Sequence, residues 1–223
     1  AGAAWLLLNR VDNLAPDYPL VRPKYALLLL IAPLALAEAL IQWQFFSGLK
    51  PDLITSCCGA LFGPDAQGVA AELVGLEPAT SLAALYLSGL AILVVGLLYR
   101  YRGWGGRLFA LLAALGFVIA LAAIVSSVAL YVYEHPHHHC PFCLLKTGHD
   151  LVGYLLYPPL FTATALALGI GLIRIWHRVP SLAGVIATEG RRLVGLALMF
   201  FGLFYGVATW LILRSNLVLL GSG

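Results

Sequence analysis

The chain has 223 residues, of which 61% are hydrophobic and 10% are charged, and its formal net charge is +3. Soluble domains contain about 45–50% apolar and about 25% charged residues, so this composition, with a mean hydropathy of +0.94, excludes a water-soluble fold. The small net charge and the lack of a basic patch with interleaved aromatic residues argue against nucleic-acid binding. The sequence predicts an all-α, polytopic membrane helix bundle in a lipid bilayer.

The first 24 residues precede the predicted membrane helices. Their apolar stretch Ala3–Leu8 is too short to cross a membrane, and it lacks the charged front and long apolar run of a complete signal peptide. We therefore interpret residues 1–24 as an N-terminal surface segment.

Five apolar stretches are long enough to cross a hydrocarbon core about 30 Å thick. Because lipid offers no hydrogen-bond partners to the backbone, each should form an α-helix. In chain order the predicted spans are Tyr25–Phe46, Ser81–Tyr99, Leu108–Tyr133, Leu151–Trp176 and Leu193–Leu213. This pattern predicts a four-helix transmembrane core over residues 25–176, followed by a cytoplasmic loop and a fifth helix over residues 177–223.

Basic residues are concentrated in alternate connections between the spans. Lys and Arg close to span ends are retained in the cytoplasm. Of the 13 basic residues, all except Lys50, Lys146 and Arg214 precede span 1, or lie between spans 2 and 3, or lie in the last turn of span 4 or between spans 4 and 5. This distribution predicts a cytoplasmic N-terminus, an external C-terminus and two external loops, which follow spans 1 and 3.

All four cysteines fall in the two predicted external loops. Cys57 and Cys58 are adjacent in the first loop, and Cys140 and Cys143 form a Cys-Pro-Phe-Cys motif in the second. The outer side of a bacterial inner membrane is oxidising, so disulfides can form and exchange there. One interpretation is purely structural, with two static disulfides or packed thiols.

The Cys-Pro-Phe-Cys motif stands close to the predicted start of the fourth span. A helix dipole and protonated imidazoles in the preceding segment would stabilise a thiolate at Cys140 and favour thiol-disulfide exchange. Leu144 follows the motif where a c-type haem site requires histidine, which argues against haem attachment. A disulfide between the adjacent Cys57 and Cys58 would be strained and easily reduced.

The order of these features resembles the vitamin K epoxide reductase family of membrane thiol-disulfide oxidoreductases, and the functionally parallel quinone-linked disulfide-forming oxidases of bacteria. In that family a cytoplasmic N-terminus leads to a first span, an external loop with a cysteine pair, two further spans, and a Cys-x-x-Cys motif that opens the fourth helix. Residues 25–176 follow this plan. The loop cysteines of the family are usually separated by several residues, whereas here they are adjacent.

The resemblance implies a catalytic role for all four cysteines and a quinone as cofactor. Cys143 would react with the quinone, Cys140 would exchange with the loop pair, and Cys57 or Cys58 would react with an external thiol-containing partner protein. The implied location is the inner membrane of the cell, with both cysteine loops on the external, periplasmic side.

Glu38 and Gln42 are polar residues one helical turn apart inside the first predicted span. A carboxyl group in the membrane is costly and is usually functional or paired within the bundle. In the redox interpretation, we expect both residues at the quinone site, where Glu38 would take up or release protons. The alternative is a protonated Glu38 that is hydrogen-bonded to a neighbouring helix.

A second functional interpretation is the binding or transport of a soft metal such as copper, zinc or mercury. Thiolate and imidazole groups are ligands that these metals prefer. The candidate ligands in the second loop are His135, His137, His138, His139, Cys140 and Cys143. The sequence thus leaves three interpretations open: a quinone-dependent oxidoreductase, a metal-binding or transport protein, and a structural subunit of a larger membrane complex.

Overall fold

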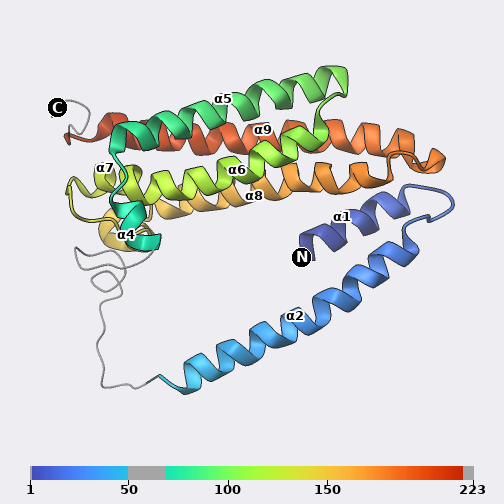
Figure 1. The fold of residues 1–223 in the computed structure, drawn as a ribbon, viewed down its shortest axis with the longest axis horizontal. Helices are drawn as coiled ribbons and strands as arrows, with labels where there is room; N and C mark the ends of the chain where they lie inside the picture. Colours follow the sequence, from blue (N-terminus) through green and yellow to red (C-terminus); the bar gives the residue numbers. More distant parts are fainter. Residues whose placement is uncertain (1, 50–68, 218–223) are drawn as a thin grey trace. The chain divides into compact units, whose positions relative to one another are not determined.

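The computed structural model describes residues 2–49 and 69–217 (Figure 1). Over these residues the regular secondary structure is helical and contains no strand. The chain divides into two compact units, one comprising residues 1–55 and 172–190 and the other residues 56–171 and 191–223. The predicted site residues Cys57 and Cys58 lie outside the described residues.

The first unit is built on a helical hairpin of α1 (Gly2–Asn13) and α2 (Val21–Ser47). Most of the predicted surface segment is thus helical. The 27-residue helix α2 covers the predicted span Tyr25–Phe46 and continues through Pro33. The unit also contains the short 3-10 helix η4 (Arg174–Trp176) and the first part of α9 (Pro180–Arg214).

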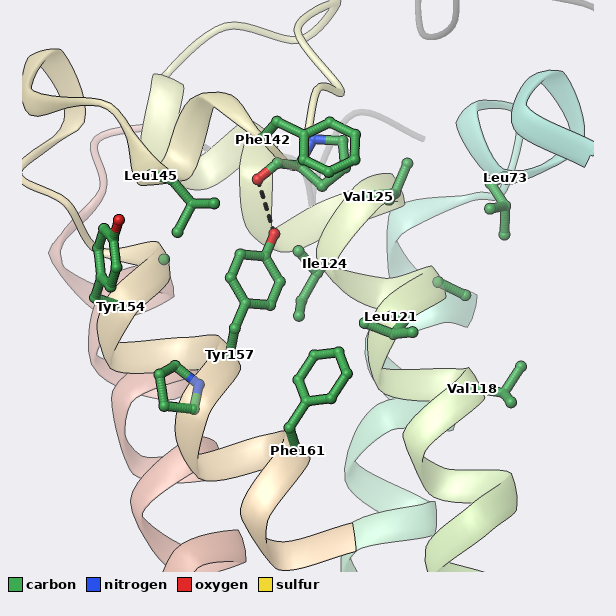
Figure 2. Close-up of a pocket in the computed structure, with 14 residues that line it drawn as sticks. Leu73, Val118, Leu121, Ile124, Val125, Phe142, Leu145, Tyr154, Tyr157 and Phe161 are labelled. Atoms are coloured by element: carbon green, nitrogen blue, oxygen red, sulfur yellow. Dashed lines mark hydrogen bonds between the residues drawn. The ribbon is translucent and has the colours of Figure 1, made fainter. Parts of the chain in front are cut away.

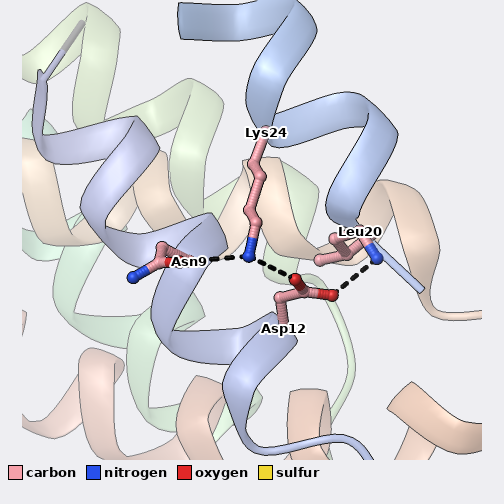
Figure 3. Close-up of polar contacts among 4 residues, drawn as sticks. All are labelled: Asn9, Asp12, Leu20 and Lys24. Atoms are coloured by element: carbon pink, nitrogen blue, oxygen red, sulfur yellow. Dashed lines mark hydrogen bonds and ion pairs between the residues drawn. The ribbon is translucent and has the colours of Figure 1, made fainter. Parts of the chain in front are cut away.

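A buried ion pair holds α1 against the first turn of α2 (Figure 3). Asp12 Oδ2 lies 2.7 Å from Lys24 Nζ, and Asp12 Oδ1 accepts a hydrogen bond of 2.7 Å from the backbone N–H of Leu20. Lys24 Nζ also donates to Asn9 Oδ1 at 3.2 Å. A charge as deeply buried as Asp12, which is 0% exposed, is stable only with partners of this kind.

Two further contacts join the N-terminal residues to the start of α9 within the same unit. The Arg10 guanidinium donates two hydrogen bonds to the Glu189 carboxylate, at 2.9 and 3.0 Å. Ser181 Oγ donates to Asp17 Oδ2 at 2.9 Å. A bidentate Arg–carboxylate pair is geometrically specific, so it fixes the register of α1 against α9.

The second unit contains α5 (Pro78–Arg102), α6 (Gly106–Ala123), α8 (Gly153–Ile173) and the later part of α9 (Figure 1). The helix α5 ends at Gly103, whose φ of 70° is a left-handed conformation that glycine adopts without strain. This turn lets α6 run back along α5. A Cβ at Gly96 would lie 2.7 Å from Leu198 Cδ2, so this glycine permits the close approach of α5 and α9.

The helix α6 continues into α7 (Ala129–Tyr133) through a π-helical turn, η1 (Ile124–Val128). Ser126 and Ser127 of this turn are buried and form hydrogen bonds with Ser81 of α5, at 2.8 and 2.7 Å. Single π-helical turns inside α-helices are frequent at functional sites. The helix ends at Tyr133, because Glu134 has a φ of 52°.

Five helical segments in the described part of the chain are long and apolar enough to cross a membrane. The predicted all-α, polytopic membrane bundle is therefore confirmed. These segments are Val21–Ser47, Pro78–Arg102, Gly106–Tyr133, Gly153–Trp176 and Pro180–Arg214.

The fifth helix begins earlier than the predicted span Leu193–Leu213. Hydropathy identifies only the part of a helix that is apolar, whereas Glu189, Arg191 and Arg192 are good helix formers that extend α9 toward Pro180. The helix is therefore longer than its apolar segment.

Candidate functional site

The Cys-Pro-Phe-Cys motif lies in the connection between α7 and α8, in the second unit. Both cysteines are buried, with Cys140 1% and Cys143 5% exposed. A short 3-10 helix, η2 (Cys143–Leu145), begins at the second cysteine, and η3 (Thr147–His149) separates it from α8. The motif precedes the fourth membrane helix as predicted, but it does not form that helix's first turn. Because a helix dipole acts mainly at the terminal turn, we assign no contribution from the α8 dipole to Cys140.

Two tyrosine hydroxyl groups hold the backbone of the motif from both sides. Tyr133, at the end of α7, donates a hydrogen bond of 2.7 Å to the carbonyl oxygen of Cys140. Tyr157, on α8, donates one of 2.8 Å to the carbonyl oxygen of Pro141. The motif is therefore anchored to the two helices that it connects.

A buried histidine ties the motif to the π-helical turn. His139 Nδ1 lies 3.1 Å from the carbonyl oxygen of Val125, and since a carbonyl only accepts, Nδ1 carries the proton in this contact. The π-helical geometry explains why that carbonyl can serve as acceptor. The Ala129 N–H bonds to the carbonyl of Ile124, five residues back, whereas in an α-helix it would bond to Val125.

A second histidine is packed in an aromatic cluster on the same loop. The ring centroid of His138 lies 4.3 Å from that of Tyr133, and the Tyr133 ring is 4.4 Å from His149. Burial lowers the pKa of His138, and positive charge on the other loop imidazoles and on Lys146 lowers it further. The neutral form is thus favoured at pH 7. His138 Nε2 is buried and has no hydrogen-bond partner within the described residues.

An apolar pocket with a volume of about 720 Å³ adjoins the motif (Figure 2). Pro141 and Phe142 of the motif form one wall, and Val125 of the π-helical turn forms another. Figure 2 shows the Tyr157 hydroxyl directed toward the motif, with the Phe161 ring farther along α8. Ligand pockets typically enclose about 300–1,000 Å³ and have apolar, aromatic walls. This pocket is large enough for a planar organic ring, and it reaches the cysteine loop.

The six candidate metal ligands do not form one cluster in the structure. His139 contacts Val125, His138 packs on Tyr133, and His135 and His137 are exposed. Across residues 2–49 and 69–217, no group of three or more His, Cys, Asp and Glu side chains is arranged to hold a metal ion. The soft-metal interpretation remains a prediction from the sequence.

Glu38 and Gln42 contact each other on α2. Gln42 Nε2 donates a hydrogen bond of 3.3 Å to Glu38 Oε1, as expected for residues one helical turn apart. Both belong to the first unit, whereas the cysteine motif belongs to the second. Their predicted role at a quinone site stays a prediction, as do the roles of Cys57 and Cys58.

The sequence did not identify Tyr133, Tyr157 and His149 as parts of the site. Their contribution is visible only in the tertiary structure, because a hydroxyl that bonds a loop carbonyl leaves no spacing pattern in the sequence. The one available signal was the concentration of aromatic and imidazole side chains on both sides of the cysteine motif.

Comparison of the chain with protein-family models, curated proteins and solved structures gives no match.

Proposed function

We propose that this protein is a multi-pass membrane thiol-disulfide oxidoreductase, similar to the vitamin K epoxide reductase family, that exchanges electrons between external protein thiols and a membrane quinone. One observation carries the proposal: the buried cysteine motif supplies Pro141 and Phe142 to the wall of an apolar pocket. A redox-active dithiol beside a pocket for a planar apolar ring is the arrangement that this reaction requires.

The proposed location follows from the charges near the span ends. An inner-membrane protein with the predicted topology has its cysteine loops on the oxidising, external side. Thiols of a partner protein would reach the motif from that side.

The pocket walls suit a quinone ring because they are apolar and include aromatic side chains. When bound, a quinone supplies an acceptor for two electrons and two protons. Oxidation of the Cys140 and Cys143 thiols to a disulfide releases two electrons and two protons, so the reaction balances. Thiol-disulfide exchange with a partner dithiol then reduces the motif and leaves the partner oxidised.

The surrounding residues have positioning roles in this proposal. Tyr133 and Tyr157 fix the carbonyl groups of Cys140 and Pro141, which sets the path of the motif along the pocket. His139, the residue before Cys140, is bonded to the π-helical turn through its own ring. Positioning of this kind matters because exchange requires the attacking and the attacked sulfur atoms to align.

The direct test uses the purified, reduced full chain under anaerobic conditions. Addition of a short-chain quinone should consume thiols, with one quinone reduced for each pair of thiols lost, and Cys143→Ser should abolish this coupling. Elemental analysis of the same sample separates the rival function. Unreactive thiols together with a stoichiometric amount of copper or zinc would contradict the redox proposal and favour metal binding.

A variant that fills the pocket tests the quinone site separately from the thiol chemistry. Ala122 lines the pocket, so Ala122→Phe should raise the KM for quinone while leaving alkylation of the reduced cysteines unchanged. Ala114→Phe is the matched control, since Ala114 is on the same helix but does not line the pocket. Equal effects of the two substitutions would argue that the pocket does not bind the quinone.

A further inference from the structure

A basic cleft with a volume of about 400 Å³ lies in the second unit, where the apolar part of α5 ends. It is lined by Arg100, Tyr101, Arg191 and Arg192. The described residues that line it carry three guanidinium groups and no carboxylate. The cleft shares no lining residue with the pocket at the cysteine motif.

Arg100 is held in place by the backbone of α9. Its Nη1 donates a hydrogen bond of 3.1 Å to the carbonyl oxygen of Arg191. A Cβ at Gly195 would clash with the same nitrogen, so the glycine makes room for the guanidinium against the helix. A guanidinium has five N–H donors, and the bond to Arg191 uses one of them. Arg100 is therefore positioned in advance of any ligand.

The cleft lies where the apolar segments of α5 and α9 end, which is the level expected for the membrane interface. The apolar run of α5 ends before Arg100, and the apolar run of α9 begins at Leu193. Tyr101, in the last turn of α5, and Trp104, in the connection to α6, are 75% and 64% exposed. Exposed aromatic residues of this kind are typical of the headgroup level, which is where lipid phosphates are found.

We propose that this cleft binds the phosphate of an anionic lipid headgroup. Guanidinium groups bind phosphate through paired hydrogen bonds, and basic pockets between membrane helices accept anionic headgroups on the cytoplasmic side. Arg100 supplies a fixed donor from α5, and Arg191 supplies positive charge from α9. The site is independent of the redox proposal, because it uses neither the cysteines nor the apolar pocket.

Native mass spectrometry of the detergent-purified full chain tests this site. Phosphatidylglycerol should bind more tightly than phosphatidylcholine, and Arg191→Gln should weaken phosphatidylglycerol binding by at least about tenfold, as expected for a lost charge-assisted hydrogen bond. Arg107→Gln is the matched control, because Arg107 is a nearby basic residue that does not line the cleft. It should leave the affinity unchanged.

Two further measurements complete the test. Arg191→Lys keeps the charge but loses the planar fork, so its affinity should fall between those of the wild type and Arg191→Gln, and it provides a second variant if the first does not fold. The position of the headgroup at the membrane interface orients a lipid phosphate but not a free phosphate ion. Inorganic phosphate should therefore bind at least about tenfold more weakly than phosphatidylglycerol. Equal binding of both lipids, an equal loss in Arg107→Gln, or inorganic phosphate that binds as tightly as the lipid would overturn the proposal.

Discussion

The loop residues next to the cysteines are held by contacts to carbonyl oxygens. The hydroxyls of Tyr133 and Tyr157 and the ring of His139 each bond a backbone carbonyl, at 2.7, 2.8 and 3.1 Å. A net stabilisation of about 0.5–1.5 kcal/mol for each such bond is enough to select one loop conformation. The positions of the cysteines thus depend on Tyr133, Tyr157 and His139, which are not part of the Cys-x-x-Cys motif.

Replacement of His139 separates the donor function of its ring from the bulk of its ring. The amide nitrogen of Asn can take the place of Nδ1, so His139→Asn should retain the contact to Val125, and most quinone-coupled thiol oxidation should remain. His139→Phe keeps the bulk and loses the donor, which leaves the Val125 carbonyl without it and should lower stability by about 1–3 kcal/mol. Both are measured as the thermal midpoint in detergent and the coupled oxidation rate. A His139→Phe variant as stable and active as the wild type would show that the tether has no role.

The aromatic cluster around His138 predicts a pH dependence of stability. Its pKa in the folded protein lies below its usual value of about 6.5, chiefly because of burial. The unfolded chain therefore binds more protons in this range, so stability should fall as pH decreases through about 6.5 and level off below the folded pKa. The thermal midpoint at pH 7.5 and 5.5 measures this loss.

His138→Gln should reduce that pH dependence, because it removes the titrating ring. His137→Gln is the control, since His137 is exposed on the same loop and lies outside the contact with Tyr133. The same pH dependence in all three proteins would assign the effect to another group.

At the scale of whole elements, the π-helical turn η1 combines two tasks. It presents the Val125 carbonyl to His139, and it places Ser126 and Ser127 against Ser81 of α5. Buried hydroxyl groups that satisfy one another are a recurrent form of helix association in membranes. The turn therefore links the packing of α5 to the position of the cysteine loop.

Removal of the shared serine hydroxyl tests this link. Ser81→Ala removes the hydroxyl that both serines bond, while Ser126 keeps its bond to the Ala122 carbonyl and Ser127 its longer contact to the Pro78 carbonyl. The free energy of unfolding should therefore fall by about 0.5–1.5 kcal/mol, and the buried cysteines should become more reactive toward a maleimide. Thr80→Ala is the control, because Thr80 is the preceding residue and is exposed. Its effect should stay within about 0.5 kcal/mol. An unchanged maleimide rate in Ser81→Ala would separate the serine contacts from the loop.

The elements differ in how far the sequence predicts them. Long apolar runs specify membrane helices because only a helix satisfies the backbone in lipid, and all five predicted spans lie on helices. The π-helical turn at Ile124–Val128 has no compositional signal, since its residues would fit an α-helix equally well. The 3-10 helices η2 and η3 likewise depend on loop contacts, so the sequence did not predict these two short helices between the cysteines and α8.

For the molecule as a whole, the distribution of basic residues predicts how the chain crosses the membrane. A reporter that fluoresces only in the cytoplasm should glow when fused after Arg178 and stay dark when fused after Gly223. Fusions at the same two positions of a variant with added arginines near the C-terminus serve as a check that the reporter responds to orientation. The reverse pattern would place both cysteine loops in a reducing compartment and contradict the proposed reaction.

Contacts between distant parts of the chain are beyond what the sequence can show. Arg10 and Glu189 are 179 positions apart, and Arg100 and Arg191 are 91 positions apart. Neither pair has a spacing that suggests proximity. The sequence alone therefore predicts the spans and the chemistry of the cysteine motif, whereas the apolar pocket and the basic cleft emerge only from the tertiary fold.

The central claim is that Cys140 and Cys143 act as a redox couple, and a Cys140→Ser variant tests it most directly. Without Cys140, a mixed disulfide between Cys143 and a loop cysteine or a partner protein has no motif thiol to resolve it, so this covalent adduct should accumulate. A non-reducing gel should show this species, reduction should remove it, and it should be absent from the Cys140→Ser, Cys143→Ser double variant. A Cys140→Ser variant that forms no adduct and still couples thiol oxidation to quinone reduction at the wild-type rate would contradict the claim.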